Sequence, residues 1–243
     1  MSFLEGLFSL AGRVAVVTGA SRGIGRATAV AIAREGAHTI VAARDASALE
    51  ATLGAIRDAG GGATAVPTDV SKAADVDQLF RVASGIGPPV ALVCAAATLE
   101  RELFDEISLA SWEHTISVNL TGVFNCCRAA FTPMRNAGEG RIVNIASLSG
   151  VYATEKFPGL AAYNASKYGV IGLTEGIAVE GKPFGISAIS VSPGAVDTDM
   201  LRRANPALRA TLVPHQVAAM IVALLDSPLS VASGANIPLF SNA

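Results

Sequence analysis

Tyr163 and Lys167 stand four residues apart in the stretch YNASK. On a helix this spacing places the two side chains on one face, a turn apart. A phenol ordinarily ionises near pH ~10, which is too high for ready proton exchange at neutral pH. An adjacent ammonium favours the phenolate, so we expect Lys167 to lower the pKa of Tyr163 and make it a general acid or base. The same spacing is common on helix surfaces, so the catalytic interpretation needs support from the rest of the chain.

A glycine-rich segment, TGASRGIG, occupies residues 18–25 between an apolar run and a helical pattern. Glycine lets the backbone turn tightly and approach a pyrophosphate, which the N-terminus of the next helix stabilises. The spacing is GxxxGxG rather than the commoner GxGxxG, and a plain strand-to-helix connection would also be glycine-rich. In this context the segment predicts a cofactor site that includes Gly19, Ser21, Arg22, Gly23, Ile24 and Gly25.

The second apolar run ends in VAARD, and this ending bears on the choice of cofactor. A carboxylate here would bind the adenosine ribose hydroxyls and select NAD. Ala43 holds that position instead, and Arg44 and Arg22 offer two fork-shaped cations for a 2′-phosphate. The pattern therefore favours NADP(H), although Asp45 is able to reach the ribose and both arginines would also be stable in solvent.

Further candidates lie at the ends of other apolar runs. Asp69 in TDV is able to accept from an adenine amino group or to cap the next helix. Asn119 lies in an apolar helical pattern, where a buried amide needs a hydrogen-bonding partner; structural and catalytic roles fit equally. Ser147 ends a central run where a substrate carbonyl would lie, with Ser149 as a close competitor. Thr198, in a loop that Pro193 and Gly194 fix, is able to bind a nicotinamide carboxamide or simply to complete a turn.

The elements that must position these residues follow one alternating pattern. Short β-rich runs separated by patterns of helical length predict βαβ units, and hence a single α/β domain over residues 1–243 with a doubly wound, mostly parallel seven-stranded sheet between helical layers. The predicted strands are Val14–Thr18, His38–Ala42, Ala63–Pro67, Val90–Cys94, Arg141–Ala146, Ser187–Ser192 and Ala235–Leu239. The predicted helices are Gly25–Glu35, Ala46–Ala59, Ala73–Ser84, Trp112–Ala137, Ala162–Glu180 and Pro214–Asp226.

Composition narrows the class of protein. The 243 residues are 51% apolar and only 16% charged, a shortage of charge that predicts self-association. A net charge of −2 without a basic tract argues against nucleic acid or anionic membranes as partners. Mean hydropathy is +0.47, yet the longest apolar run that resembles a membrane span stops at Asp226 and is too short to cross a bilayer. The N-terminus lacks the basic region of a signal peptide. Three cysteines in apolar segments predict free thiols, hence a cytoplasmic location, and the three histidines have no metal-ligand spacing.

Taken in order, these segments resemble the short-chain dehydrogenase/reductase family, in its single-domain branch that includes 3-oxoacyl-acyl-carrier-protein reductases. The resemblance covers residues 10–239 and implies a carbonyl reductase that acts on a small-molecule carbonyl or alcohol. Tyr163 would exchange the proton, Lys167 would lower its pKa and hold the nicotinamide ribose, Ser147 would orient the substrate oxygen, and Asn119 would hold a relay water. The family's glycine position at Gly150 favours Ser147 over Ser149. The implied cofactor contacts include Asp69, Val70, Ala95, Ala96, Pro193, Gly194, Val196 and Thr198, and two long helices imply a homotetramer or dimer.

The chain departs from the family pattern in three places. The usual NNAG is replaced by Cys94-Ala95-Ala96-Ala97. The interval from Ser147 to Tyr163 is longer than is typical, and it places Tyr152, Lys156 and Phe157 near the substrate mouth. The segment after Thr198 is short, and Pro238-Leu239-Phe240 replaces a C-terminal VDGG. Two other hypotheses therefore stay open beside the NADP(H) reductase: an NAD-dependent dehydrogenase, and a cofactor-binding regulatory protein without turnover.

Overall fold

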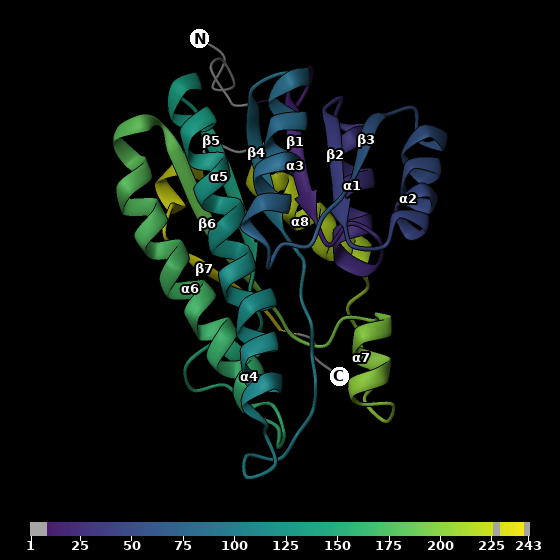
Figure 1. Ribbon diagram of the computed structural model, residues 1–243, viewed down its shortest axis with the longest axis vertical. Coiled ribbons are helices and arrows are strands. Elements are labelled where there is room, and N and C mark those ends of the chain that lie inside the picture. Colours follow the sequence, from purple (N-terminus) through teal and green to yellow (C-terminus); the bar gives the residue numbers. More distant parts are fainter. Residues whose placement is uncertain (1–8, 226–228, 241–243) are drawn as a thin grey trace.

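Seven parallel strands form one twisted sheet in the order β3-β2-β1-β4-β5-β6-β7 (Figure 1). The computed structural model describes residues 9–225 and 229–240. Each neighbouring pair runs parallel, including β6 with β7, so the prediction of a doubly wound, mostly parallel sheet is confirmed and the sheet is parallel throughout. The strands are β1 Val14–Thr18, β2 His38–Ala43, β3 Gly62–Pro67, β4 Pro89–Cys94, β5 Gly140–Ile145, β6 Ile186–Pro193 and β7 Asn236–Leu239.

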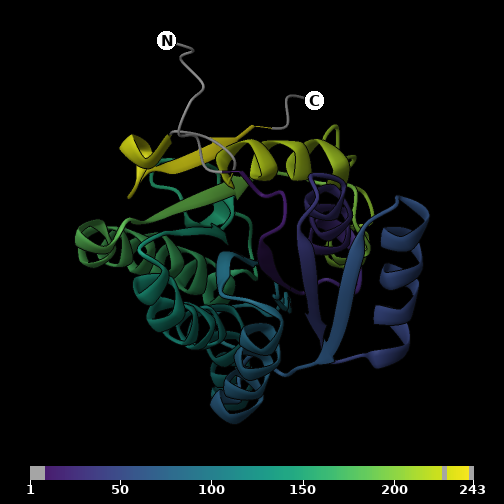
Figure 2. The same ribbon diagram turned by 90° about the horizontal axis from the view of Figure 1, so that it is seen from above.

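Helices cover both faces of the sheet, as Figure 2 shows from above. The central strands are rich in Val, Ile and Ala, which suits burial on two sides. Two apolar cores result, one on each face. One face carries α1 Gly23–Arg34, α2 Ala46–Asp58 and α8 Pro214–Leu225. The other carries α3 Ala73–Ile86, α4 Leu109–Ile116, α5 Gly122–Ala137 and α6 Ala161–Gly181.

The predicted helix Trp112–Ala137 is the main difference from the sequence-based expectation. Its chain forms α4 and α5, separated by a π-turn over Ser117–Thr121 that contains Asn119. Such turns are rare in proteins, and those that occur often lie at functional sites. The helix also begins earlier than expected because the Ser108 hydroxyl caps it, accepting from Ser111 N at 3.1 Å. The other predicted elements agree to within two residues of the observed bounds, with Asp226 outside the described residues.

The parallel pairing brings the carboxyl ends of the strands to one edge. Thr18 at the end of β1 lies in register with Ala42 of β2 and with Cys94 of β4. The order of strands reverses between β1 and β4, and ligands of such sheets bind outside this point. The glycine-rich turn, the chain after β4 and the chain after β5 all leave the sheet at this edge.

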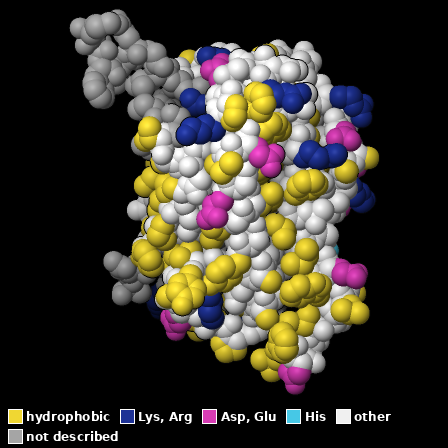
Figure 3. Space-filling model, turned by 90° about the vertical axis from the view of Figure 1, so that its left-hand side faces the viewer, with side chains coloured by type: hydrophobic (Ala, Val, Ile, Leu, Met, Phe, Trp, Pro, Cys, Tyr) yellow, Lys and Arg dark blue, Asp and Glu magenta, His cyan; other side chains and the backbone are white. Residues whose placement is uncertain are grey.

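The outer face of α4, α5 and α6 carries exposed apolar side chains (Figure 3). Leu109 is 79% exposed and Val179 is 75% exposed. Trp112, Phe124 and Phe184 also lie on the surface here. In the part of the chain that the structure describes, no helix has both the length and the hydropathy to cross a membrane.

Candidate active site

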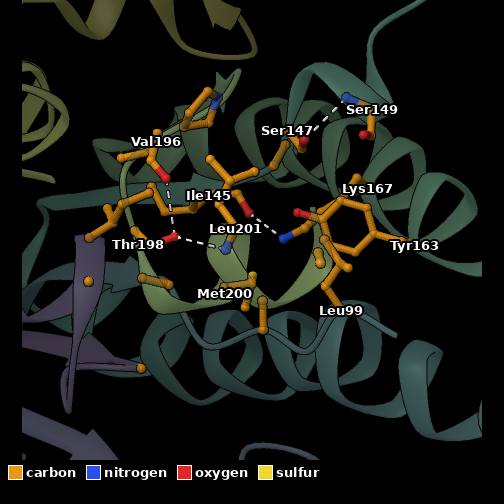
Figure 4. Close-up of a pocket in the computed structure, with 18 of the residues that line it drawn as sticks. Leu99, Ile145, Ser147, Ser149, Tyr163, Lys167, Val196, Thr198, Met200 and Leu201 are labelled. Carbon is orange, nitrogen blue, oxygen red and sulfur yellow. Dashed lines mark hydrogen bonds between the residues drawn. The ribbon is translucent and has the colours of Figure 1, made fainter. Parts of the chain in front are cut away.

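A cavity of about 1010 Å³ lies at the carboxyl edge of the sheet. The glycine-rich turn and Arg44 form one end of its wall, and Ser147, Tyr163 and Lys167 contribute to the rest (Figure 4). With the exception of Asn119, every residue that the sequence analysis placed in the site lines this cavity. Residues from Gly19 to Thr198 thus meet in one cavity, although the sequence separates them widely.

Tyr163 and Lys167 lie one turn apart in α6, as their spacing predicts, and both are buried. The Lys167 ammonium donates to the carbonyl of Ile145 at 2.8 Å. Its nitrogen lies 5.6 Å from the centre of the Tyr163 ring. The last carbonyl of β5 therefore holds the ammonium near the Tyr163 ring at the cavity wall.

Burial dominates the acid–base properties of this pair. It raises the pKa of Tyr163 above its ordinary value, and the hydrogen bond with the Ser147 hydroxyl acts in the opposite direction. Burial also lowers the pKa of Lys167 to about 8, against an opposing electrostatic contribution from Cys94. The expected lowering of the Tyr163 pKa by Lys167 is thus not confirmed: burial raises that pKa, and the hydrogen bond of Ser147 is the contribution that lowers it.

Ser147 follows β5 and begins a 3₁₀ turn over Leu148–Gly150. Its hydroxyl oxygen accepts from the backbone N–H of Ser149 at 3.1 Å, and it lies within hydrogen-bonding reach of Tyr163. A side chain at Gly150 would meet the backbone of Lys167 at 2.5 Å, so only glycine lets the turn pack this closely on α6. The turn therefore presents Ser147, rather than Ser149, to the phenol.

Asn119 is a buried amide with hydrogen-bonding partners, as the sequence analysis expected. It is fully buried, and its side chain pairs with the backbone of Thr98: Oδ1 accepts from the N–H at 2.8 Å and Nδ2 donates to the carbonyl at 2.9 Å. Nδ2 also lies 3.2 Å from the Ser166 hydroxyl, which donates to the carbonyl of Tyr163 at 2.7 Å. The side chain therefore braces the chain after β4 against α6.

The glycine-rich turn fits a pyrophosphate through its lack of side chains. Gly19 has φ +66°, and a Cβ there would lie 2.6 Å from the backbone of Ala95. A Cβ at Gly25 would lie 2.2 Å from the carbonyl oxygen of Gly19. Larger residues would close the turn against itself and against the chain after β4. The space beside the N-terminus of α1 therefore remains open for an anion.

Arg26 and Thr52 hold this turn and were not identified from the sequence. The Arg26 guanidinium binds the carbonyl of Ser21 and, at 3.1 Å, the Thr52 hydroxyl. Thr52 in turn donates to the carbonyl of Ala20 at 2.8 Å. An arginine inside an amphipathic helix gives no signal of this role, because the bracing partner comes from α2, some 26 residues away.

The end of the cavity where the sequence analysis expects the adenosine combines two exposed arginines with two carboxylates that already accept hydrogen bonds. Arg22 and Arg44 both line the cavity. Asp45 caps α2 by accepting from Ala48 N at 3.0 Å, a bond that lowers its pKa. Asp69 accepts from the backbone and hydroxyl of Ser71; these bonds, with the charges of Lys72 and Arg44, outweigh its burial and lower its pKa. The arginines thus remain exposed at this end of the cavity, where their charges act on Asp45 and Asp69.

Thr198 begins α7 Asp199–Ala204, a short helix that the sequence analysis did not predict. Its hydroxyl caps that helix, accepting from Leu201 N at 3.3 Å, and lies 3.2 Å from the carbonyl of Val196. A threonine followed by an acidic residue is an N-cap signal that would have located the helix. Leu99, Met200 and Leu201 project into the cavity that Tyr163 lines (Figure 4), and none of the three was expected there.

Two segments that depart from the family pattern, residues 94–97 and 238–240, also contribute to the cavity. Ala95, Ala96 and Ala97 line it, and Cys94 is buried beneath them. The N–H of Ala96 lies 3.4 Å from the Thr18 hydroxyl, which ties this segment to the end of β1. Phe240, in the altered C-terminal segment, lines the cavity as well. The backbone path along the cavity is therefore maintained with small side chains in place of the usual asparagines and glycine.

Known proteins match this chain over most of its length. The family model for short chain dehydrogenase matches residues 13–209. A 3-oxoacyl-acyl-carrier-protein reductase from Synechocystis sp. is 39% identical over 199 residues, which cover 81% of this chain and 79% of that protein. A short-chain type dehydrogenase/reductase from Mycobacterium marinum superposes with a TM-score of 0.90 at 30% identity, covering 97% and 96% of the two chains. The actinorhodin polyketide ketoreductase, solved with NADPH, has a TM-score of 0.86 at 30% identity, covering 94% and 96%.

Proposed function

The chain belongs to the short-chain dehydrogenase family, whose oxidoreductases act on carbonyl and alcohol groups, and on that premise we propose that it interconverts a ketone and a secondary alcohol with NADP(H). The observation that carries the proposal is the meeting of the Ser147 hydroxyl and the Tyr163 phenol at the cavity wall, with the Lys167 ammonium held behind them. These three groups supply the proton transfer and hydrogen bonding that the reaction needs.

Each group has a distinct role in the proposal. Tyr163 gives its proton to the carbonyl oxygen during reduction and takes it back during oxidation. Ser147 donates a hydrogen bond to the same oxygen and stabilises the negative charge that develops there. Lys167 keeps a positive charge near the phenol and would bind the ribose of a nicotinamide cofactor. A bound nicotinamide supplies or accepts the hydride, while the protein supplies geometry and electrostatics.

The preference for NADP(H) rests on the adenosine corner. Arg22 and Arg44 are able to grip a 2′-phosphate in fork geometry. Asp45, the carboxylate best placed to bind ribose hydroxyls, is committed to capping α2. If NAD bound as tightly as NADP and Arg44→Ala left both affinities unchanged, the NAD-dependent alternative would replace this part of the proposal.

We further propose an apolar substrate. Around Tyr163 the cavity is lined by Leu99, Val151, Leu160 and Met200, which stabilise hydrophobic substituents on either side of a carbonyl. The short helix α7 stands over this end of the cavity and leaves room for a bulky group. This proposal names a chemical class and no individual compound.

The test is a panel of ketones and secondary alcohols, read by NADPH absorbance and repeated with NADH. We expect turnover of at least one apolar ketone, and a loss of about a thousandfold in kcat for Tyr163→Phe because the proton donor is removed. Tyr152→Phe, in an exposed tyrosine at the cavity mouth, is the matched control. Near wild-type turnover by Tyr163→Phe would exclude the mechanism. Tight NADPH binding without turnover of any compound would favour a regulatory role.

We also propose that the chain forms a homo-oligomer, a tetramer or a dimer, through the exposed apolar face of α4, α5 and α6. Covering Leu109, Trp112 and Val179 would remove a large apolar area from water. Sedimentation equilibrium would give the number of chains directly. The buried free thiols at Cys94, Cys126 and Cys127 are compatible with a reducing compartment, which we take to be the cytoplasm.

A further inference from the structure

Three side chains bind the loop that follows Ser147; we call Thr154, Lys156 and Tyr168 the loop clamp. The ammonium of Lys156 has three protons, and three acceptors surround it: the carbonyl oxygen of Val151 at 2.7 Å, that of Leu148 at 3.1 Å and the Thr154 hydroxyl at 2.7 Å. The same ammonium lies 5.3 Å from the centre of the Tyr168 ring. A lysine on an exposed loop is thus fully engaged by its neighbours.

The other two members of the loop clamp bind the same two carbonyls. The Thr154 hydroxyl lies 2.6 Å from the carbonyl oxygen of Leu148 and 2.9 Å from that of Val151. The Tyr168 hydroxyl donates to the carbonyl of Val151 at 3.0 Å. Five contacts therefore converge on two backbone oxygens, and one of them comes from α6, the helix that carries the proposed catalytic pair.

The clamped carbonyls belong to the turn that presents Ser147. Leu148 is its immediate neighbour, and the N–H groups of Gly150 and Val151 close the turn on the carbonyls of Ser147 and Leu148 at 2.9 and 3.0 Å. Val151 also lines the cavity wall. The loop clamp thus connects one residue of the proposed reacting centre and one of the substrate wall to the same ammonium.

The loop is bent where the clamp holds it. Ala153 has φ +58°, the only positive φ at a non-glycine residue among residues 9–225 and 229–240. An L-residue in this region is strained and persists where the surroundings hold it there. Thr154 and Lys156 follow Ala153 and contact the carbonyls of Leu148 and Val151, which precede it, so the loop clamp holds the chain across the bend.

We propose that Lys156 is a positioning residue, which through the loop clamp fixes Ser147 against Tyr163 and Val151 in the substrate wall. This inference rests on the proposed function for its kinetic consequence. It assigns a role to the segment that makes the interval from Ser147 to Tyr163 long. The added residues build a brace from one side of the loop to α6.

The experiment compares Lys156→Met, which keeps length and removes every donor, with Lys156→Arg, which restores donors. Lys182→Met, an exposed lysine remote from the cavity, is the matched control. Hydrogen exchange of the full chain without cofactor reports on the loop directly. We expect the amides of Gly150 and Val151 to exchange about tenfold faster in Lys156→Met than in the wild type, as expected for a loop that opens locally, with other protected amides unchanged.

Kinetics supply the second readout. For a ketone that the wild type reduces, we expect Lys156→Met to lower kcat/KM for the ketone about tenfold because Ser147 and the wall lose their alignment. The KM for NADPH should stay unchanged, and Lys156→Arg should recover much of the loss. Wild-type exchange and kinetics in Lys156→Met would overturn the proposal, as would exchange that rises throughout the chain. If the wild type reduced no ketone, the proposed function would fail while the exchange result still decided whether the clamp exists.

Discussion

The two ends of the cavity differ in what mainly shapes their turns, although Arg26 and Thr52 brace the first turn and the second also needs Gly150. At the cofactor end, the turn over residues 18–25 is shaped by the absence of side chains, since a Cβ at Gly19 or Gly25 would strike backbone within 2.6 Å. At the substrate end, the turn after Ser147 is shaped by side chains, since an ammonium and two hydroxyls bind its carbonyls. The first construction depends on a few fixed glycines. The second depends on a set of contacts that can be exchanged one at a time.

This difference teaches how one fold separates reaction from specificity. On the proposed function, the cofactor end matches a ligand that family members share, and its glycines permit only that close backbone approach. The substrate end has to match a ligand that differs between family members, and a clamped loop offers many variable positions around one fixed serine. Substitutions at the two ends should therefore have separable effects on cofactor and substrate.

The largest difference between the effect on turnover and the effect on cofactor binding is expected for Ser147→Ala. Loss of a hydrogen-bond donor to the developing oxyanion should reduce kcat by about a hundredfold, by analogy with other such donors. Cofactor binding should be unaffected, because the glycine-rich turn and Arg44 lie at the other end of the cavity. Stopped-flow turnover and the quenching of protein fluorescence by NADPH measure the two quantities. Ser149→Ala is the control, and a comparable loss there would assign the role to Ser149.

Gly25→Ala should give the reverse pattern. The added methyl lies 2.2 Å from the carbonyl oxygen of Gly19, so the turn must open to accept it. Overpacking of this kind costs about 1–3 kcal/mol, which corresponds to a loss in NADPH affinity of about tenfold to a hundredfold. Titration calorimetry gives the affinity, and Gly172→Ala, where nothing lies near the added methyl, is the control. Hydrogen exchange at residues 148–151 should stay at wild-type rates; faster exchange there would show that the two ends are coupled.

The smallest effect concerns Lys167, where the two ends meet. Its folded-state pKa of about 8 lies below the value of ~10.4 for an unfolded lysine. Between these values the unfolded chain binds the additional proton, so the wild type should gain stability relative to Lys167→Met as the pH rises from 8 to 10. Below pH 8 both forms are protonated and the difference should be constant.

The expected gain is about 2 kcal/mol in the free energy of unfolding across that window. Urea unfolding of the cofactor-free chain at a series of pH values measures it. Lys182→Met, at an exposed site, should run parallel to the wild type. Parallel curves for Lys167→Met as well would mean that the ammonium is hydrated in the fold and that burial does not lower its pKa.

Local patterns in the sequence account for most of the fold. Runs such as Val14–Thr18 are apolar on both faces and have the length of buried strands. The glycine-rich turn predicts where the first helix begins. Tyr163 and Lys167 could be paired because helical spacing is a local property. The apolar run before Ser147 likewise predicted that this residue follows a strand, at the carboxyl edge of the sheet. Each of these inferences needs only residues that are close in sequence.

The features that were missed depend on partners distant in sequence. Asn119 was recognised as a buried amide, but its partner Thr98 is 21 residues away, so its role as a brace was hidden. Arg26 and Thr52 lie in separate helices, and neither has a recognisable motif. The raised pKa of Tyr163 could not be predicted from the sequence because burial is a property of the assembled core.

The pairing of Asn119 with Thr98 has an evolutionary consequence. Its amide accepts from the N–H and donates to the carbonyl of Thr98, so the chain after β4 is anchored to the π-turn. The chain leaves that anchor immediately before Leu99, which faces the cavity. Residues beyond the anchor can therefore change by mutation or insertion without altering the direction in which the backbone departs. Descendants of this fold could acquire new substrates there while inheriting an unaltered reacting centre.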